Sequence, residues 1–177
     1  RTTGESTPDD FSAANCYDTM ADFDASIADN DTIIFADGTY TSSAFENAAS
    51  RGYALLSEGI TIKAQTRGGV TLQSGIATGL FRWSADLSGN DITIDGFIIE
   101  EGTTAANYYI WVDNSSATKG TLTVTHCSFS APVFYSVYNG TSSDMDVTVS
   151  NCNHLGGGRS FLNSVDMDDG DVLIQNC

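Results

Sequence analysis

The residues best suited to acid–base chemistry lie together near the C-terminal end of the sequence. His154 and Arg159 fall within the segment NCNHLGGGR. A neutral imidazole can accept a proton near neutral pH, and a guanidinium beside it can stabilise the negative charge that develops. His154 follows Cys152 by two residues, however, and the preceding repeat has Phe129 at that place. This alignment predicts an inward or rim position, so we expect no catalytic residue, and His154 and Arg159 are the only candidates.

Closely spaced carboxylates near the C-terminal end indicate a candidate calcium site. The segment DMDDGD (166–171) combines acidic residues with a glycine turn, and Ca²⁺ binds through such oxygen ligands. In the repeat described below, these residues lie beside acidic residues of the preceding coil, and stacked like charges are unfavourable without a cation. The candidate ligands are Asp144, Asp146, Asp166, Asp168, Asp169 and Asp171. The alternative is a solvated acidic turn, since the segment lacks the full spacing of an EF-hand loop.

Four cysteines allow either free thiols or disulfides. Cys127, Cys152 and Cys177 recur at a constant spacing, which we call the repeat interval. Strands stacked in register point their side chains the same way, which suits a reduced column of small apolar groups better than a disulfide. Cys16 lies at the other end of the repeat and cannot reach Cys177 of its own chain. If subunits stack end to end, we expect an intermolecular Cys16–Cys177 disulfide in an oxidising compartment.

Asparagines form two further patterns. The N-x-S/T sequons at Asn30, Asn114 and Asn139 are candidate glycosylation sites. Asn114 and Asn139 are also separated by the repeat interval, and Asn163 lies one residue short of the next step. This spacing favours a structural ladder of stacked asparagines over two glycans at one edge of the molecule.

Two sets of side chains could bind a sugar or an ice surface. The first is a hydroxyl column, which consists of Thr61, Thr93, Thr123 and Thr148. The adjacent column is chemically mixed, and threonine favours exposed strand positions in any case, so we expect this column to have no binding role. The second is a group of aromatic residues, namely Trp83, Tyr108, Tyr109, Trp111, Tyr135 and Tyr138. Because side chains alternate along a strand, about half of these rings should belong to the core.

The elements that must position these residues are short strands in a repeat. One phrase recurs at the repeat interval as TLTVTHC (121–127), DVTVSNC (146–152) and DVLIQNC (171–177). Earlier copies are DITIDGF (91–97), GITIKAQ (59–65) and DTIIFAD (31–37). Alternating apolar residues predict strands that are buried on one face, and a second apolar cluster follows in each copy. The pattern predicts a parallel β-solenoid, with a sandwich or barrel as the alternative.

One turn position recurs between the strands of this repeat. His126, Asn151 and Asn176 occupy the same place in three successive copies. Asparagine is favoured in turns because it tolerates the left-handed backbone conformation. We therefore expect these three side chains to stack at a corner of the solenoid.

The N-terminal section shows a helical pattern instead. Tyr17, Met20, Phe23 and Ile27 recur at helical spacing, and Asn15 is a suitable N-cap. We expect an N-terminal extension over 1–15, a cap helix over 16–30 and coils over 31–177, in one domain of about five or six coils. The helix would cover the apolar end of the first coil. No such cap follows the last strand phrase, so we expect further coils there or a stacked subunit.

Three segments resemble the opening coils of the polysaccharide lyases of the chondroitinase B and alginate lyase group. They are DTIIFADGTYTSS, GITIKAQTRGGVTLQSG and DITIDGFIIEEG, and the match covers residues 16–102. The resemblance implies an all-β, right-handed, single-stranded parallel β-helix of the pectate lyase-like kind. It also implies β-elimination of uronate polymers by a lysine and an arginine, commonly with Ca²⁺ on the substrate carboxylate. No residue of this sequence matches those catalytic positions, which lie on later coils.

Composition limits the partners that such a surface can attract. Seven Lys and Arg residues against 23 Asp and Glu residues give a net charge of −16. This charge disfavours nucleic acid, anionic membranes and acidic polymers, unless cations intervene. No apolar run approaches the roughly 20 residues needed for membrane insertion. The four cysteines, the sequons and the hydroxyl-rich composition favour secretion.

These observations predict a secreted, non-catalytic β-helix module with a structural or adhesive extracellular role. We expect self-association end to end into filaments, with polysaccharide as a further partner and Ca²⁺ as the one candidate cofactor. The first alternative is the N-terminal part of a polysaccharide lyase that acts on alginate or chondroitin. The second is a carbohydrate- or ice-binding solenoid.

Overall fold

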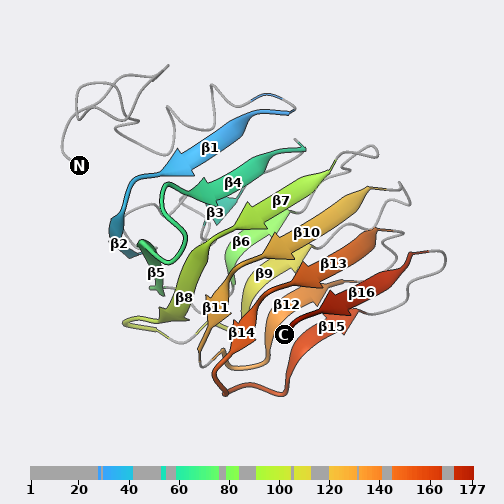
Figure 1. Ribbon diagram of the computed structural model, residues 1–177. Coiled ribbons are helices and arrows are strands. Elements are labelled where there is room, and N and C mark those ends of the chain that lie inside the picture. The colour runs from blue at the N-terminus through green and yellow to red at the C-terminus, as the bar shows by residue number, and fades with distance from the viewer. Residues whose placement is uncertain are drawn as a thin grey trace.

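The alternating apolar side chains of the strand phrases point into the core of a parallel β-solenoid. The computed structural model describes residues 28, 30–41, 53–54, 59–75, 79–83, 91–104, 106–112, 120–130, 132–140, 145–164 and 170–177. Their strands form three parallel sheets, and about four turns separate the first and last strands of the two five-stranded sheets. Figure 1 shows the strands stacked from β1 to β16. The prediction of an all-β parallel solenoid is confirmed, and the sandwich and barrel alternatives are wrong.

Each of the first five coils contributes one strand to each of three sheets, and β16 adds a sixth strand to the first sheet. The first sheet contains, in spatial order, β1 (Thr32–Phe35), β4 (Thr61–Ala64), β7 (Ile92–Asp95), β10 (Thr121–Thr125), β13 (Asp146–Ser150) and β16 (Val172–Gln175). The second contains β2 (Gly38–Thr41), β5 (Val70–Ser74), β8 (Phe97–Glu101), β11 (Ser128–Phe129) and β14 (Asn153–His154). The third contains β3 (Tyr53–Ala54), β6 (Gly79–Trp83), β9 (Tyr108–Val112), β12 (Tyr135–Asn139) and β15 (Ser160–Ser164).

The register of the first sheet follows the sequence repeat. Val124 of β10 pairs with Ile94 of β7 on one side and with Val149 of β13 on the other, and Val149 pairs with Ile174 of β16. The two steps from Val124 to Ile174 equal the repeat interval, whereas the step from Ile94 to Val124 is longer. The turns absorb this difference in length, because the strands must stay in register for their apolar rows to remain buried.

The corner that follows the first sheet requires a left-handed backbone. The φ angle is 88° at Gly96 and 53° at His126, Asn151 and Asn176. These residues occupy the same place in successive coils, and the side-chain amide of Asn176 donates a hydrogen bond of 3.3 Å to Asn151 Oδ1. Glycine and asparagine adopt this conformation at low cost, whereas most residues do not. The predicted stacking of asparagines at this turn is therefore confirmed for Asn151 and Asn176.

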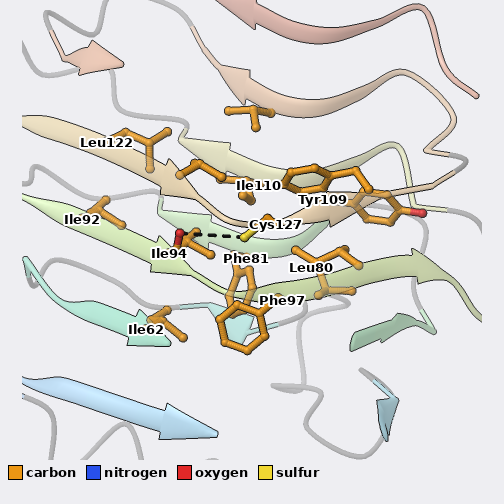
Figure 2. Close-up of a cluster of buried hydrophobic side chains, with 14 of the residues drawn as sticks. Ile62, Leu80, Phe81, Ile92, Ile94, Phe97, Tyr109, Ile110, Leu122 and Cys127 are labelled. Atoms are coloured by element: carbon orange, nitrogen blue, oxygen red, sulfur yellow. Dashed lines mark hydrogen bonds between the residues drawn. The ribbon is translucent and has the colours of Figure 1, made fainter. Parts of the chain in front are cut away.

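The core is a continuous apolar column between the three sheets. Figure 2 shows Ile62, Ile94 and Leu122 of the first sheet packed with rings from the other sheets. Ile62, Ile94 and Leu122 are fully buried. Burial of one such side chain contributes about 1.5–3 kcal/mol. Packing between coils, rather than any single contact, therefore holds the solenoid together.

The predicted N-terminal elements lie largely outside the described residues. This applies to the extension over 1–15 and to most of the cap helix over 16–30. Ala28 and Asn30 are described, and they belong to a turn in which Asp31 Oδ2 accepts a hydrogen bond from the Ala28 amide. The described residues form no helix, and hence none with the length and apolar character needed to span a membrane.

Candidate functional site

The outer face of the third sheet carries a cluster of partly exposed rings. In β9 and β12 two consecutive residues point inward, Tyr109–Ile110 and Ser136–Val137, so residues three positions apart share the outer face. We call the resulting cluster the aromatic strip. It consists of Tyr108, Trp111, Phe134, Tyr135 and Tyr138. If side chains alternated strictly along these strands, one ring of each pair, Tyr108 with Trp111 and Tyr135 with Tyr138, would point into the core instead.

The rings of the aromatic strip contact one another closely. The centroids of Tyr108 and Tyr138 lie 4.7 Å apart, with 26° between the ring planes. Tyr108 and Tyr135 lie 6.1 Å apart at 12°, and Tyr135 and Tyr138 lie 5.8 Å apart at 15°. Stacked rings cover one another's faces, so the strip offers mainly ring edges and phenolic hydroxyl groups to a partner.

An arginine lies over a ring at each end of the aromatic strip. The guanidinium carbon of Arg82 is 3.9 Å from the Trp111 ring centroid, and that of Arg159 is 4.7 Å from the Phe134 centroid. Both distances are within the range of a cation–π interaction. Trp111 Nε1 is buried and has no hydrogen-bond partner. The two arginines thus bring positive charge to the strip in a strongly acidic protein.

The sequence predicted six aromatic candidates and expected about half of them in the core. Trp83 and Tyr109 are fully buried, and the other four lie in the aromatic strip. Phe134 was missed, as were Arg82 and Arg159 as ring partners. For the four rings that were predicted, a sequence signal could have shown which of them share the outer face. This signal is the equal spacing of Tyr108 from Tyr135 and of Trp111 from Tyr138, because each pair lies in register on adjacent strands.

A polar network crosses the corner between the first and second sheets. Asp95 accepts hydrogen bonds from Arg67 at 3.3 Å (Nε) and 3.4 Å (Nη2), and its Oδ1 lies 3.0 Å from His126 Nδ1. Thr125 Oγ1 is 2.9 Å from the same nitrogen and accepts a 3.0 Å hydrogen bond from Ser150 Oγ. The network links four successive coils. The network contacts the His126 imidazole through Nδ1, and so it restrains a residue whose φ angle is left-handed.

The corner network was not predicted from the sequence. Asp95, Thr125 and Ser150 were recognisable as members of one outward column, and His126 as a turn residue. Arg67 lies in the turn between β4 and β5, and no periodic pattern indicates that its long side chain extends to the neighbouring coil. Its side chain is 61% exposed, against 21% for that of Asp95, so solvent screens this ion pair strongly.

His154 and Arg159, the predicted candidates for acid–base chemistry, have different partners. His154 pairs with Phe129 in register, which agrees with the inward or rim position expected from the alignment. Its Nδ1 lies 3.1 Å from Ser136 Oγ, and its ring is 5.5 Å from that of Phe161. Arg159 instead lies over Phe134. These contacts are those of packing residues and do not form a base with an electrostatic partner.

The predicted calcium ligands are described only in part. Asp144, Asp166, Asp168 and Asp169 lie outside the described residues. Asp146 Oδ1 accepts a 2.8 Å hydrogen bond from the backbone amide of Asp171, and Asp91 accepts the amide of Thr121 in the same way at 2.9 Å. These carboxylates satisfy backbone donors between coils. In the described part of the chain, no three His, Cys, Asp or Glu side chains gather as metal ligands, and the calcium site stays a prediction.

The threonine column is present on the outer face of the first sheet. Thr61, Thr93, Thr123 and Thr148 are Cα partners on successive strands. The column begins with Thr32, which the sequence reasoning missed, and ends at Leu173.

The sequon asparagines do not form the expected ladder. Asn139 pairs with Val112 and Ser164, whereas Asn163 pairs with Tyr138, so the predicted stacking of Asn139 on Asn163 is wrong. The cause is that β12 and β15 keep the repeat interval, which Asn163 misses by one residue. The Asn139 side chain is fully buried, and Asn30 is exposed in a turn with φ of 70°. Asn114 lies outside the described residues.

The described cysteines are free thiols in one column. Cys127 and Cys152 are buried and Cys177 is exposed, while Cys16 lies outside the described residues. Each thiol donates to the carbonyl oxygen two residues earlier at 3.3 Å, and Figure 2 shows the further bond of 3.9 Å from Cys127 to Ile94. Burial raises the pKa of Cys127 well above its ordinary value. A hydrogen bond from Cys127 lowers the pKa of Cys152.

Comparison with family models, with curated proteins and with solved structures finds no match to this chain. No relative therefore supports membership of the chondroitinase B and alginate lyase group, and what the chain shares with that group is a parallel β-solenoid. The aromatic strip and the corner network are the two concentrations of functional groups among the described residues. Of these two, the strip is the one that brings several partly exposed large side chains together on one face.

Proposed function

We propose that the protein is a secreted, non-catalytic β-helix module with a structural and adhesive role. In this proposal the aromatic strip binds a neutral polysaccharide. The observation that carries it is the group of stacked, partly exposed tyrosines on adjacent coils, Tyr108, Tyr135 and Tyr138. Tyrosine suits such a surface because its ring provides apolar contact while its hydroxyl hydrogen-bonds a polar partner.

The charge of the protein favours a neutral polymer over an acidic one. A net charge of −16 repels carboxylated or sulfated chains at low ionic strength. Arg82 and Arg159 are the cations beside the aromatic strip, and both already lie over rings of the strip. Their charge is thus directed at Trp111 and Phe134 and is less available to a carboxylate.

The non-catalytic part of the proposal rests on how the candidate groups are used. His154 is held between Ser136 and Phe161, and Arg159 lies over Phe134. The alternative is a lyase of the right-handed β-helix type, a hand that parallel crossover connections nearly always adopt. It predicts a rise in ultraviolet absorbance from unsaturated uronate when the protein meets alginate or chondroitin sulfate. We expect no such rise.

Affinity electrophoresis tests the adhesive role directly. Gels that contain soluble mannan or hydroxyethyl cellulose should retard the wild-type protein, and alginate gels should not. Tyr138→Ser should reduce the retardation constant about tenfold, because loss of one central ring at an interface costs of the order of 1–2 kcal/mol. Thr148→Ala, on the outer face of the first sheet, is the matched control and should behave as wild type. Equal retardation of Tyr138→Ser and wild type would contradict the proposal.

A second candidate function is end-to-end assembly, which the last strand of the first sheet favours. Val172, Leu173 and Ile174 of β16 are 45%, 47% and 50% exposed, whereas Val147 and Val149 of β13 are fully buried. We propose that β1 of a second copy pairs with β16, because β1 carries the same alternating phrase at the opposite end of the same sheet. Such a head-to-tail contact does not close, so it propagates as a filament.

The assembly proposal has its own test. The intermolecular disulfide between Cys16 and Cys177 would form at the same contact in an oxidising compartment. Non-reducing electrophoresis should then show a ladder of multimers that disappears with reductant and in Cys177→Ser. A monomer in sedimentation velocity at high protein concentration would contradict this assembly while leaving the polysaccharide proposal standing.

A further inference from the structure

The three tyrosines of the aromatic strip form a mutual cluster, which we call the tyrosine cluster. Tyr108 of β9 and Tyr135 of β12 are Cα partners on adjacent strands, and Tyr138 follows on β12. All three rings are partly exposed, and every pair of centroids lies between 4.7 and 6.1 Å apart. The phenol groups of two successive coils are thus held at a separation close to that of two covalently joined rings.

We propose that the tyrosine cluster is an oxidative modification site, at which a peroxidase and hydrogen peroxide couple Tyr108 to Tyr138 as dityrosine. Each phenol loses one electron and one proton and becomes a phenoxyl radical. The two radicals form a carbon–carbon bond between the ring positions ortho to the oxygens, and the two displaced ring hydrogens restore the hydroxyl groups. Formation of one cross-link thus removes two hydrogen atoms from the protein, and these reduce one molecule of hydrogen peroxide to two molecules of water.

Proximity makes coupling within one molecule the favoured reaction of these radicals. Two groups held in contact react as if each were present at a very high local concentration. Coupling requires the rings to turn from stacked to edge-to-edge, which partly exposed side chains can do. Tyr108 and Tyr138 form the closest pair, at 4.7 Å. The product would join β9 to β12 covalently across successive coils.

Tyr40 and Tyr109 lack this geometry. The Tyr40 ring lies against Phe35, and its hydroxyl donates to the carbonyl oxygen of Ala36. Tyr109 is fully buried and stacks on Phe129, and its hydroxyl donates to the carbonyl oxygen of Ser130. Burial is also the main reason why the pKa of Tyr109 lies well above its ordinary value. Tyr40 therefore provides a matched control for loss of one phenol.

The test oxidises dilute purified protein with horseradish peroxidase and hydrogen peroxide. Dityrosine is followed by its blue fluorescence, and the joined peptides are identified by tandem mass spectrometry of the monomer band. Wild type and Tyr40→Phe should give equal fluorescence and one product that joins Tyr108 to Tyr138. The double variant Tyr108→Phe/Tyr138→Phe leaves Tyr135 without a tyrosine partner in the strip and should lose about tenfold or more of the signal.

The outcomes separate this proposal from polysaccharide binding, on which it does not depend. Phenylalanine keeps the ring and removes only the hydroxyl, so circular dichroism should show that the variants remain folded. Undiminished fluorescence in the double variant would overturn the proposal. So would dimers whose yield rises with protein concentration in place of a cross-linked monomer, or addition of oxygen at Trp111 without coupling.

Discussion

Replacement of Asn151 by alanine tests the left-handed corner that follows β7, β10, β13 and β16 of the first sheet. Asn151 has a φ of 53°, and its side-chain oxygen accepts the hydrogen bond from Asn176 at 3.3 Å. Alanine carries a Cβ that disfavours this backbone conformation, and it removes the acceptor. The backbone cost is about 1–2 kcal/mol. An exposed hydrogen bond adds about 0.5 kcal/mol, so we expect Asn151→Ala to lower the free energy of unfolding by about 2 kcal/mol.

Two comparison variants isolate the backbone contribution. Asn151→Gly removes the same hydrogen bond but has no Cβ, so it should be less destabilising than alanine by about 1 kcal/mol, even after glycine's extra chain entropy. Asn153→Ala removes an exposed asparagine two residues later, on β14, and should change the free energy of unfolding by less than about 0.5 kcal/mol.

Urea denaturation followed by circular dichroism measures these free energies. The three variants should keep the slope of the wild-type transition, so that the midpoints report stability alone. If Asn151→Gly were as destabilising as Asn151→Ala, the left-handed corner would not be the reason for asparagine at this place. If Asn153→Ala matched Asn151→Ala, the effect would belong to asparagine in general.

Three further predictions concern the core, the thiols and the corner network. Ile94→Ala should lower the free energy of unfolding by about 2–5 kcal/mol and Ile94→Val by about 0.5–1.5 kcal/mol, measured by the same denaturation; equal effects would argue against a packed interior. Iodoacetamide should label exposed Cys177 in the native protein at least about tenfold faster than buried Cys127, as mass spectrometry of digests would show, and equal rates would contradict the burial of Cys127. Asp95→Asn should cost about 1 kcal/mol at low salt and less at high salt, since it removes the charge that faces Arg67; a cost independent of salt would contradict this.

The fold of the first sheet was predictable because its strands obey a simple period. Val147 and Val149 alternate with polar residues, and the same phrase returns after one repeat interval in β16, so strand direction, buried face and register all follow from the sequence. The turns between earlier coils vary in length. In the sequence this variation appears only as a longer interval between successive strand phrases. The proposed cap helix has no counterpart in the repeat and falls mostly on residues that the structure does not describe.

The aromatic strip was predictable only in part. In β12 both Ser136 and Val137 point inward, and this break in alternation decides which rings reach the surface. Neither strand alternation nor the repeat interval reveals such a break. The step from β9 to β12 is also longer than the repeat interval, so Val112 occupies the place beside Asn139 that the sequence assigned to Asn114. The ion pair of Arg67 with Asp95 depends on the reach of a long side chain in a turn, which has no sequence period.

A nuclear magnetic resonance titration of the isotopically labelled protein with a neutral mannan oligosaccharide tests the central functional claim most directly. We expect amide shifts to change in β9 and β12 around Tyr108 and Tyr138, and the amide shifts of the threonine column on the outer face of the first sheet to stay unchanged. The oligosaccharide should be recovered uncleaved after the titration. Shift changes confined to the first sheet around Thr123, or no shift changes at saturating oligosaccharide, would contradict polysaccharide binding by the aromatic strip.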